Sequence, residues 1–257
     1  MRQSTSDIFK KMFPSLLIYL VILAVYSLIT KSMGLGTDAM VSMPEPGQFS
    51  PPSFNTSAES ILAIILQLIY FVMAGLIGFG IILSIYRVAR YGSDISFADY
   101  FYFFNGKWYK AFLTYIVSGI FTLIGIGLLI IPGIVFSIAM VPLGAVMGVN
   151  YLKGEYGIMQ SIRDSWNLTK GFKGMIFGRC LIAGIIVMVI AIAWAFAFMG
   201  ISTTGGVVSS ISQSVITVIS GLIMYVAVID SIRELVDRGA FERIDKSEES
   251  LEEGETV

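Results

Sequence analysis

Residues 157–174, GIMQSIRDSWNLTKGFKG, carry polar side chains whose types and spacing could bind a negatively charged molecule. Arg163, Lys170 and Lys173 supply three cations, and Trp166 lies among them along the chain. Basic side chains near a membrane surface attract anionic phosphates, and tryptophan prefers the headgroup layer. We therefore take these four side chains as candidate contacts for an anionic lipid or for an acidic partner segment.

The same stretch has an apolar pattern. Ile158, Ile162 and Trp166 recur every four residues, which places them on one face of a helix. We predict an amphipathic helix over residues 157–169. Its apolar face either lies on the membrane surface or packs on the end of a helical bundle, and the sequence leaves both interpretations open.

Residues suited to catalysis are sparse. The chain has no histidine and one cysteine, Cys180, which removes the commonest general base, CxxC metal sites and any intramolecular disulfide. Metal-assisted hydrolysis needs several converging acids. The acids expected near the inner membrane face, outside the C-terminal segment, are scattered: Asp94, Asp99, Glu155, Asp164 and Asp230. We expect a protein that is not an enzyme, without a cofactor, a metal site or a nucleic-acid partner.

The elements that position these residues are predicted to be membrane helices. Hydrophobic residues make up 56% of the 257 residues and charged residues 14%, with a mean hydropathy of +0.81. Ordinary globular chains carry about 25% charged residues. A soluble domain of this length could not bury so much apolar surface. The composition therefore predicts an integral membrane protein.

Six segments match the roughly 20 apolar residues that a helix needs to cross a bilayer core about 30 Å thick. They are residues 12–30, 60–86, 110–131, 133–150, 175–199 and 206–229. We predict an all-α polytopic bundle of six transmembrane helices over residues 1–240. An acidic, disordered cytoplasmic tail is expected at residues 241–257.

Almost nothing polar separates the third and fourth of these segments. One helix through both would be about 60 Å long, twice the bilayer core. Pro132 lacks a backbone donor, and Gly133 tolerates turn conformations. We predict a tight hairpin whose turn is Pro132-Gly133.

Basic residues predict the orientation. With a cytoplasmic N-terminus, 16 of the 17 lysines and arginines fall on the inner side, and only Lys31 falls outside. This asymmetry follows the positive-inside rule and predicts a cytoplasmic (inner) membrane protein with both termini cytoplasmic. The outer segment, residues 31–59, is rich in Pro and Ser and is expected to be an extended, flexible loop.

Two inner linkers, residues 87–109 and 151–174, have nearly equal lengths and are expected to form amphipathic elbow helices on the cytoplasmic face. In the first linker, Phe97, Phe101 and Phe104 are spaced as one face of an α-helix. Residues 99–112 and 164–177 share an Asp, a Gly seven positions later and a Phe thirteen positions later. This match suggests a parallel internal repeat.

Glycines at close spacing are expected to let helices approach one another. They are Gly75, Gly78 and Gly80, the pair Gly144 and Gly148, and the pair Gly174 and Gly178.

The stretch IIPGIVFSIAMVPLGAVMGVNYLKGEYGIMQSIRDSWNLTKG resembles a prokaryotic polytopic family. That family is related to the glycerophosphoryl diester phosphodiesterase membrane domain and to YciC-like uncharacterised inner-membrane proteins. A Pro-Gly pair and the ending Ser-Trp-x-Leu-Thr-x-Gly carry the resemblance, here Pro132, Gly133, Ser165, Trp166, Leu168, Thr169 and Gly171. It covers residues 81–177 and departs from the family at Ser161-Ile162 and Phe172. The resemblance implies a multi-pass fold and an inner-membrane location but no reaction.

These observations support one leading hypothesis and two alternatives. The leading hypothesis is a non-enzymatic membrane-organising or accessory protein that contacts anionic lipids or another membrane protein. The first alternative is a transporter or channel for a small neutral or lipid-like solute. No charged residue falls near the centre of a predicted span, which disfavours a proton-coupled carrier but leaves such solutes open. The second is a lipid-modifying enzyme that uses the inner-face acids.

Overall fold

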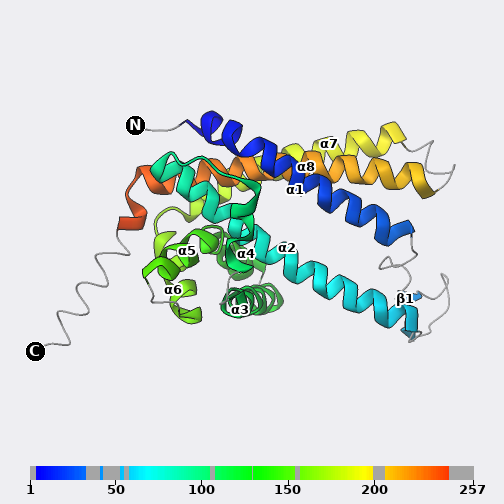
Figure 1. The fold of residues 1–257 in the computed structure, drawn as a ribbon, viewed down its shortest axis with the longest axis horizontal. Helices are drawn as coiled ribbons and strands as arrows, with labels where there is room; N and C mark the ends of the chain where they lie inside the picture. Colours follow the sequence, from blue (N-terminus) through cyan, green and yellow to red (C-terminus); the bar gives the residue numbers. More distant parts are fainter. Residues whose placement is uncertain are drawn as a thin grey trace, which may run out of the picture. The chain divides into compact units, whose positions relative to one another are not determined.

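The computed structural model describes residues 4–32, 41–42, 53–54, 58–104, 108–128, 130–153, 157–198 and 206–242, which are almost entirely helical (Figure 1). The helices are α1 (Thr5–Ser32), α2 (Ala58–Tyr91), the 3-10 helix η2 (Phe97–Phe104), α3 (Trp108–Leu128), α4 (Ile130–Ala139), α5 (Leu143–Lys153), α6 (Ile158–Leu168), α7 (Lys173–Phe198) and α8 (Gly206–Asp237). Two-residue strands β1 (Val41–Ser42) and β2 (Ser53–Phe54) pair antiparallel. The predicted all-α class is confirmed. Most of the loop predicted at residues 31–59 lies outside the described residues.

The chain divides into two compact units. Unit 1 comprises Met1–Leu16, Ala74–Ile186 and Ile223–Val257, and unit 2 comprises Leu17–Met73 and Val187–Leu222. The division passes through α1, α2, α7 and α8, whereas η2 and α3 to α6 belong wholly to unit 1. Within unit 2, the rings of Tyr26 and Tyr70 stack at 4.1 Å, and Trp194 Nε1 donates to Ser212 Oγ at 2.6 Å.

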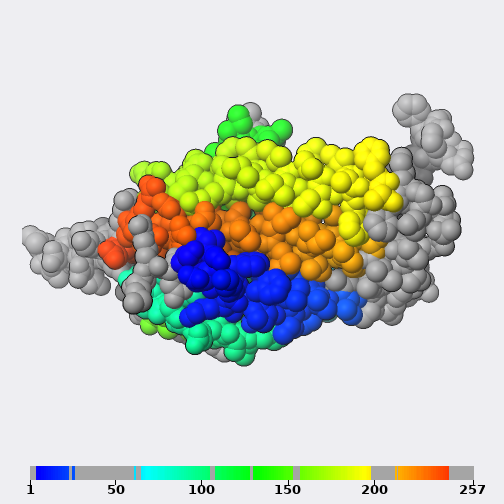
Figure 2. Space-filling view, turned by 90° about the horizontal axis from the view of Figure 1, so that it is seen from above, coloured from blue at the N-terminus to red at the C-terminus, as the bar shows by residue number. Residues whose placement is uncertain are grey.

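Four helical segments among the described residues are long and apolar enough to cross a membrane. They are Ile65–Tyr91, Trp108–Gly127, Lys173–Ala197 and Ser214–Asp237. A fifth candidate is the pair Ile130–Ala139 and Leu143–Leu152, which is bent by 42°. Along α7 (yellow in Figure 2) the apolar side chains are largely exposed, for example Ile182 at 61% and Phe196 at 68%. Exposed apolar helices of this length are compatible with a multi-pass membrane protein. The span predicted at residues 12–30 lies in α1, where several side chains fall outside the description.

The chain reverses between α3 and α4, but the predicted turn position is wrong. α3 ends at Leu128 and α4 begins at Ile130, so Pro132 and Gly133 lie in the first turn of α4. Proline is tolerated there because the first N–H groups of a helix have no intrahelical acceptor. The turn therefore precedes the Pro-Gly pair.

Gly133 is a contact point between the two helices. A Cβ atom added to Gly125 would lie 2.9 Å from Gly133 Cα, and the rings of Phe121 and Phe136 are 5.8 Å apart. These pairs run in opposite directions along the two helices, which makes α3 and α4 an antiparallel hairpin. The absence of side chains at the glycines allows their close approach.

The segment predicted as one span at residues 133–150 is interrupted at residues 140–142. Pro142 has no N–H to donate to Ile138 O, and the Val141 N–H bonds that carbonyl at 3.3 Å instead. The helix restarts as α5 at Leu143, after the 42° bend. Sequence reasoning overlooked Pro142 as the residue that breaks this span.

The helices of unit 1 do not all share one direction. Figure 1 looks almost straight down the axis of α3, whereas the unit 1 part of α8 runs across the view. Six spans in one bundle are therefore not confirmed. Figure 2 shows α7 and α8 (orange) side by side, with α1 (blue) beside α8.

The first linker forms a 3-10 helix and not the predicted α-helix. The structure buries Tyr100 and Phe103, three residues apart, and leaves Phe97, Phe101 and Phe104 partly exposed. A 3-10 helix has three residues per turn, which explains the changed face. The aligned acids of the suggested repeat thus lie in different helix types, η2 and α6, and the repeat is not confirmed.

The predicted packing role of the glycines is confirmed at Gly75, Gly80, Gly144 and Gly148, where an added Cβ would meet a neighbour within 3.0 Å. It is wrong at Gly78, Gly174 and Gly178, where no described atom lies within 4 Å. Close packing thus concentrates where α2 meets η2, α3 and α5.

The start of the segment predicted as a tail is folded in the described residues. Phe241 is buried, and its ring lies 4.5 Å from that of Tyr86. Residues 243–257 lie outside the described part of the chain.

Candidate functional site

Helix α6 presents two different faces. Ser161, Ile162, Ser165 and Leu168 are buried, and the helix packs against α3, α4 and α5. Gly157 precedes it in an extended conformation. The opposite face exposes Met159, Arg163, Trp166 and Asn167. A helix with one buried and one exposed face is therefore present, and its buried face packs on other helices. The predicted composition of that face is wrong at Trp166, which lies on the exposed side, because Ser161, Ser165 and Leu168 join Ile162 in the packed face.

Ser165 joins α6 to the broken end of α4. Its hydroxyl donates to the buried carbonyl of Ala139 at 2.7 Å. That carbonyl lies at the end of α4, and the Leu143 N–H that would reach it in a continuous helix bonds Met140 O instead. Ser165 thus satisfies an acceptor that the break at Pro142 leaves open.

Replacing Ser165 with alanine is expected to lower the free energy of unfolding by about 1–2 kcal/mol, because the Ala139 carbonyl would stay buried without a donor. Ser137→Ala is the matched control. Ser137 is an exposed residue, and its hydroxyl donates to Gly133 O of its own helix at 2.9 Å. Equal melting temperatures of the two variants would contradict this role of Ser165.

The turn between α6 and α7 depends on Thr169 and Gly171. Buried Thr169 donates its hydroxyl to Ser165 O at 3.1 Å and to Trp166 O at 3.0 Å. Gly171 has φ +88, a conformation that L side chains rarely adopt. The resemblance residues Ser165, Leu168, Thr169 and Gly171 therefore build the connection between the helices, while Trp166 points outward.

Two of the four predicted contact residues lie together. Lys173 Nζ lies 3.0 Å from the ring centroid of Trp166, in a cation–π contact. The Trp166 ring also packs against Phe136, with centroids 6.1 Å apart. The structure thus seats Lys173 on the tryptophan, which the sequence pattern did not predict.

Arg163 and Lys170 are exposed, and neither forms an ion pair with any residue that the structure describes. The one acid of α6, Asp164, accepts a hydrogen bond from Asn150 Nδ2 at 2.9 Å. Asn150 is 1% exposed. The acid is thus engaged by α5, which leaves the outer face of α6 basic.

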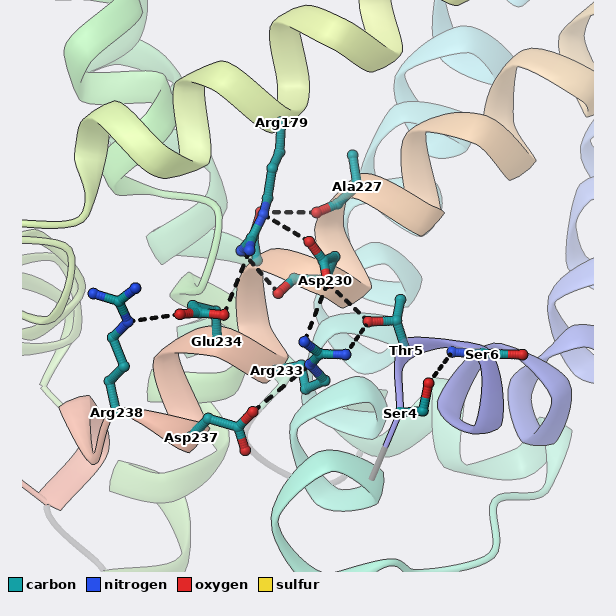
Figure 3. Close-up of polar contacts among 11 residues, drawn as sticks. Ser4, Thr5, Ser6, Arg179, Ala227, Asp230, Arg233, Glu234, Asp237 and Arg238 are labelled. Atoms are coloured by element: carbon teal, nitrogen blue, oxygen red, sulfur yellow. Dashed lines mark hydrogen bonds and ion pairs between the residues drawn. The ribbon is translucent and has the colours of Figure 1, made fainter. Parts of the chain in front are cut away.

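A polar network absent from the sequence predictions joins α1, α7 and α8 (Figure 3). Arg179 Nε lies 2.6 Å from Asp230 Oδ2, and Arg179 Nη2 lies 3.5 Å from Glu234 Oε2. Thr5 donates to Asp230 Oδ1 at 2.8 Å and accepts from Arg233 Nη1 at 2.6 Å.

Three further ion pairs belong to this network: Arg233 with Asp230 at 3.7 Å, Arg233 with Asp237 at 3.7 Å, and Arg238 with Glu234 at 2.6 Å. Its three arginines and three acids balance in charge. Spacings of three and four residues along α8 were a usable signal for part of it. The contributions of Thr5 and Arg179 depend on tertiary packing and carry no local signal.

The other acids considered for catalysis are also engaged. Asp94 pairs with Lys11 at 3.0 Å, and Asp99 lies 4.0 Å from Arg87 and accepts from the Ser96 N–H at 2.7 Å. Together with Asp164 and Asp230, these acids have separate partners on separate elements. The fifth, Glu155, lies outside the described residues.

Two tyrosines of η2 lie close to these charged groups. Burial raises the pKa of Tyr100 to about 12. Burial also raises the pKa of Tyr102, while the Arg87 guanidinium 4.6 Å from its ring centre partly offsets this effect. Both phenols therefore stay protonated at neutral pH.

Comparisons with protein-family models, curated proteins and solved structures find no match to this chain. The resemblance through the Pro-Gly pair and the Ser-Trp-x-Leu-Thr-x-Gly ending stays an expectation from the sequence.

Proposed function

We propose that this chain is a non-enzymatic, multi-pass inner-membrane protein of organising or accessory type that holds anionic lipids. The binding region is the α6 surface, defined as Arg163, Trp166, Lys170 and Lys173. An acidic segment of a partner membrane protein would use the same cations. The proposal also takes up the expected relationship to the prokaryotic family named above.

The observation that supports this function is that two cations of the α6 surface, Arg163 and Lys170, are exposed and form no ion pair within the described part of the chain. Five other described cations pair with acids within the protein, namely Lys11, Arg87, Arg179, Arg233 and Arg238. Arg163 and Lys170 flank the partly exposed Trp166 instead. Anionic phosphates complement such cations, and an indole beside them suits the headgroup layer.

In the proposed arrangement, six spans cross the membrane, both termini are cytoplasmic, and η2 and α6 form elbows at the inner surface. The distribution of basic residues supports this orientation. This orientation does not depend on how deeply the α3–α4 hairpin enters the bilayer. The start of α3 and the end of α5 would lie on the same side of the membrane whether or not the hairpin crosses it.

The alternative function, transport of a small neutral or lipid-like solute, draws its support from an apolar groove between α7 and α8. Lipid holding gives a role to the exposed cations Arg163 and Lys170, whereas the transport hypothesis does not. We therefore place lipid holding first.

The double variant Arg163→Gln/Lys170→Gln is expected to retain far less phosphatidylglycerol through purification. Each cation near an anionic surface contributes about 1 kcal/mol, so the pair corresponds to a roughly thirtyfold loss of affinity. The melting temperature should hardly change, because both side chains are exposed. Native mass spectrometry of the full chain measures both bound lipid and folding. Lys173 is left unchanged so that its cation–π contact with Trp166 is preserved.

Lys10→Gln is the control, since Lys10 is an exposed cation of α1 and lies outside the α6 surface. An equal lipid loss in this control would indicate general attraction to basic residues. Unchanged lipid content in the double variant, together with a lower melting temperature, would show that the α6 surface serves packing and not lipid binding.

A further inference from the structure

A groove about 390 Å³ in volume lies between α7 and α8 in unit 1. Its apolar walls are Ile182, Ala183, Ile186, Ile223, Val226 and Ala227. The two helices are antiparallel here, because Arg179 pairs with Asp230 at one end while Ile186 and Ile223 lie farther along. The groove therefore has one polar end, formed by Thr5, Arg179 and Asp230, and a long apolar part.

The apolar part opens on the exposed side of these helices. Ile182, Ile186 and Val226 are 61%, 46% and 41% exposed. In a membrane-spanning helix pair, such surfaces meet lipid acyl chains. An acyl chain is thus the occupant that the surroundings supply, and its headgroup would reach the polar end.

The polar end offers both donors and acceptors. Arg179 has five N–H donors; contacts with Asp230 and Glu234 engage three nitrogens, and Figure 3 shows a further contact with the Ala227 carbonyl. Asp230 Oδ1 accepts from Thr5 and also lies 3.7 Å from Arg233 Nη2, and Asp230 Oδ2 contacts Arg179; a carboxylate with about four acceptor positions keeps some capacity beyond these contacts. Their side chains remain 24% and 30% exposed, so both are accessible to a ligand.

The balanced charge of the network selects the type of headgroup. An anionic headgroup would bring its uncompensated charge close to the carboxylates of Asp230 and Glu234. A zwitterionic headgroup can direct its phosphate to the remaining N–H groups of Arg179 and its ammonium to Asp230, which matches both charges.

We propose that the α7–α8 groove binds one phosphatidylethanolamine molecule, with an acyl chain along the apolar walls and the headgroup at Thr5, Arg179 and Asp230. This second lipid site goes beyond the proposed function and shares no residue with the α6 surface. The two sites differ in preference: the α6 surface takes anionic lipid, and the groove takes zwitterionic lipid.

The test compares tryptophan substitutions at neighbouring positions of α7. Ile186→Trp places a larger side chain in the groove, whereas Ile185→Trp adds the same side chain at an exposed position that does not line it. Val226→Trp fills the groove from α8 and guards against a folding defect in the first variant. Delipidated full-length protein is titrated with phosphatidylethanolamine or phosphatidylglycerol, and adducts are counted by native mass spectrometry.

The wild type and Ile185→Trp are expected to bind phosphatidylethanolamine equally. Both groove variants should bind it about tenfold more weakly, the effect of excluding roughly two methylene groups from an apolar site. Undiminished binding in both folded groove variants, or an equal loss in Ile185→Trp, would overturn the proposal. A preference for phosphatidylglycerol that Ile186→Trp abolishes would also overturn it. Phosphatidylglycerol loss in the α6 double variant is scored separately, so either lipid site can fail alone.

Discussion

Replacing Gly80 with alanine is expected to destabilise the protein by about 3 kcal/mol or more, because the new methyl group would collide with backbone. A Cβ at this position would lie 2.7 Å from the carbonyl carbon of Tyr100 and nearer still to its oxygen. Tyr100 is fully buried, so η2 cannot shift without disturbing its own packing. The clash involves no flexible side-chain end that could move aside.

Gly78→Ala is the matched control on the same helix. Nothing described lies within 4 Å of a Cβ at Gly78, so the substitution should be neutral or stabilise by up to about 1 kcal/mol through helix propensity. Thermal unfolding of the full chain in detergent should separate the two variants by roughly 5–10 °C. Similar melting temperatures would contradict the close packing of α2 on η2.

Replacing Arg179 with methionine is expected to cost about 2–3 kcal/mol, less than for a fully buried pair because Arg179 and Asp230 are partly exposed. The change leaves the carboxylates of Asp230 and Glu234 without the cation between them. The double variant Arg179→Met/Asp230→Asn also removes the negative charge of Asp230. It should therefore lose less stability than the sum of the two single variants. The coupling energy between the two positions should be about 1–3 kcal/mol.

Arg238→Met is the control for this cycle. Arg238 also pairs with Glu234, but its side chain is 55% exposed, and such a surface pair contributes about 1 kcal/mol or less. Additive effects of the Arg179 and Asp230 substitutions would show that these groups do not act as a network. If Arg238→Met lost as much stability as Arg179→Met, the expected difference between the partly buried and the exposed arginine would be contradicted.

Features that depend on local pattern could be predicted from the sequence. The existence of helix α6 and the reversal near Pro132 were both predicted, whereas the assignment of Trp166 to the packed face of α6 was wrong. The turn was predicted a few residues too far along the chain, because proline is as well suited to the first turn of a helix as to a hairpin. The break at Pro142 was equally local and was missed because the surrounding residues are uniformly apolar.

Features that depend on tertiary contacts could not be predicted. The first linker forms the 3-10 helix η2 and not the predicted α-helix, and this geometry buries Tyr100 and Phe103 together. The bond from Ser165 to Ala139 O and the junction of Thr5 with Asp230 join residues far apart in the chain. No sequence spacing encodes such pairs.

Within the candidate site, residue types indicated which side chains are basic but not which of them are already engaged. Arg163 and Lys170 are exposed as the pattern suggested. Lys173 instead lies over the Trp166 ring, a contact that depends on the turn at Gly171. The α6 surface therefore has two outward cations and one that is held against the protein.

Lipid-selective quenching of Trp166 tests the central claim most directly. The protein carries Trp108→Phe and Trp194→Phe, so that Trp166 is the remaining tryptophan, and is placed in nanodiscs of phosphatidylethanolamine with a minor fraction of phosphatidylglycerol. In paired samples only one of the two lipids is brominated. We predict that brominated phosphatidylglycerol quenches Trp166 beyond its share of the bilayer, and that Arg163→Gln/Lys170→Gln returns quenching to that share. Quenching in proportion to bulk composition, with and without the two substitutions, would contradict a lipid-holding α6 surface.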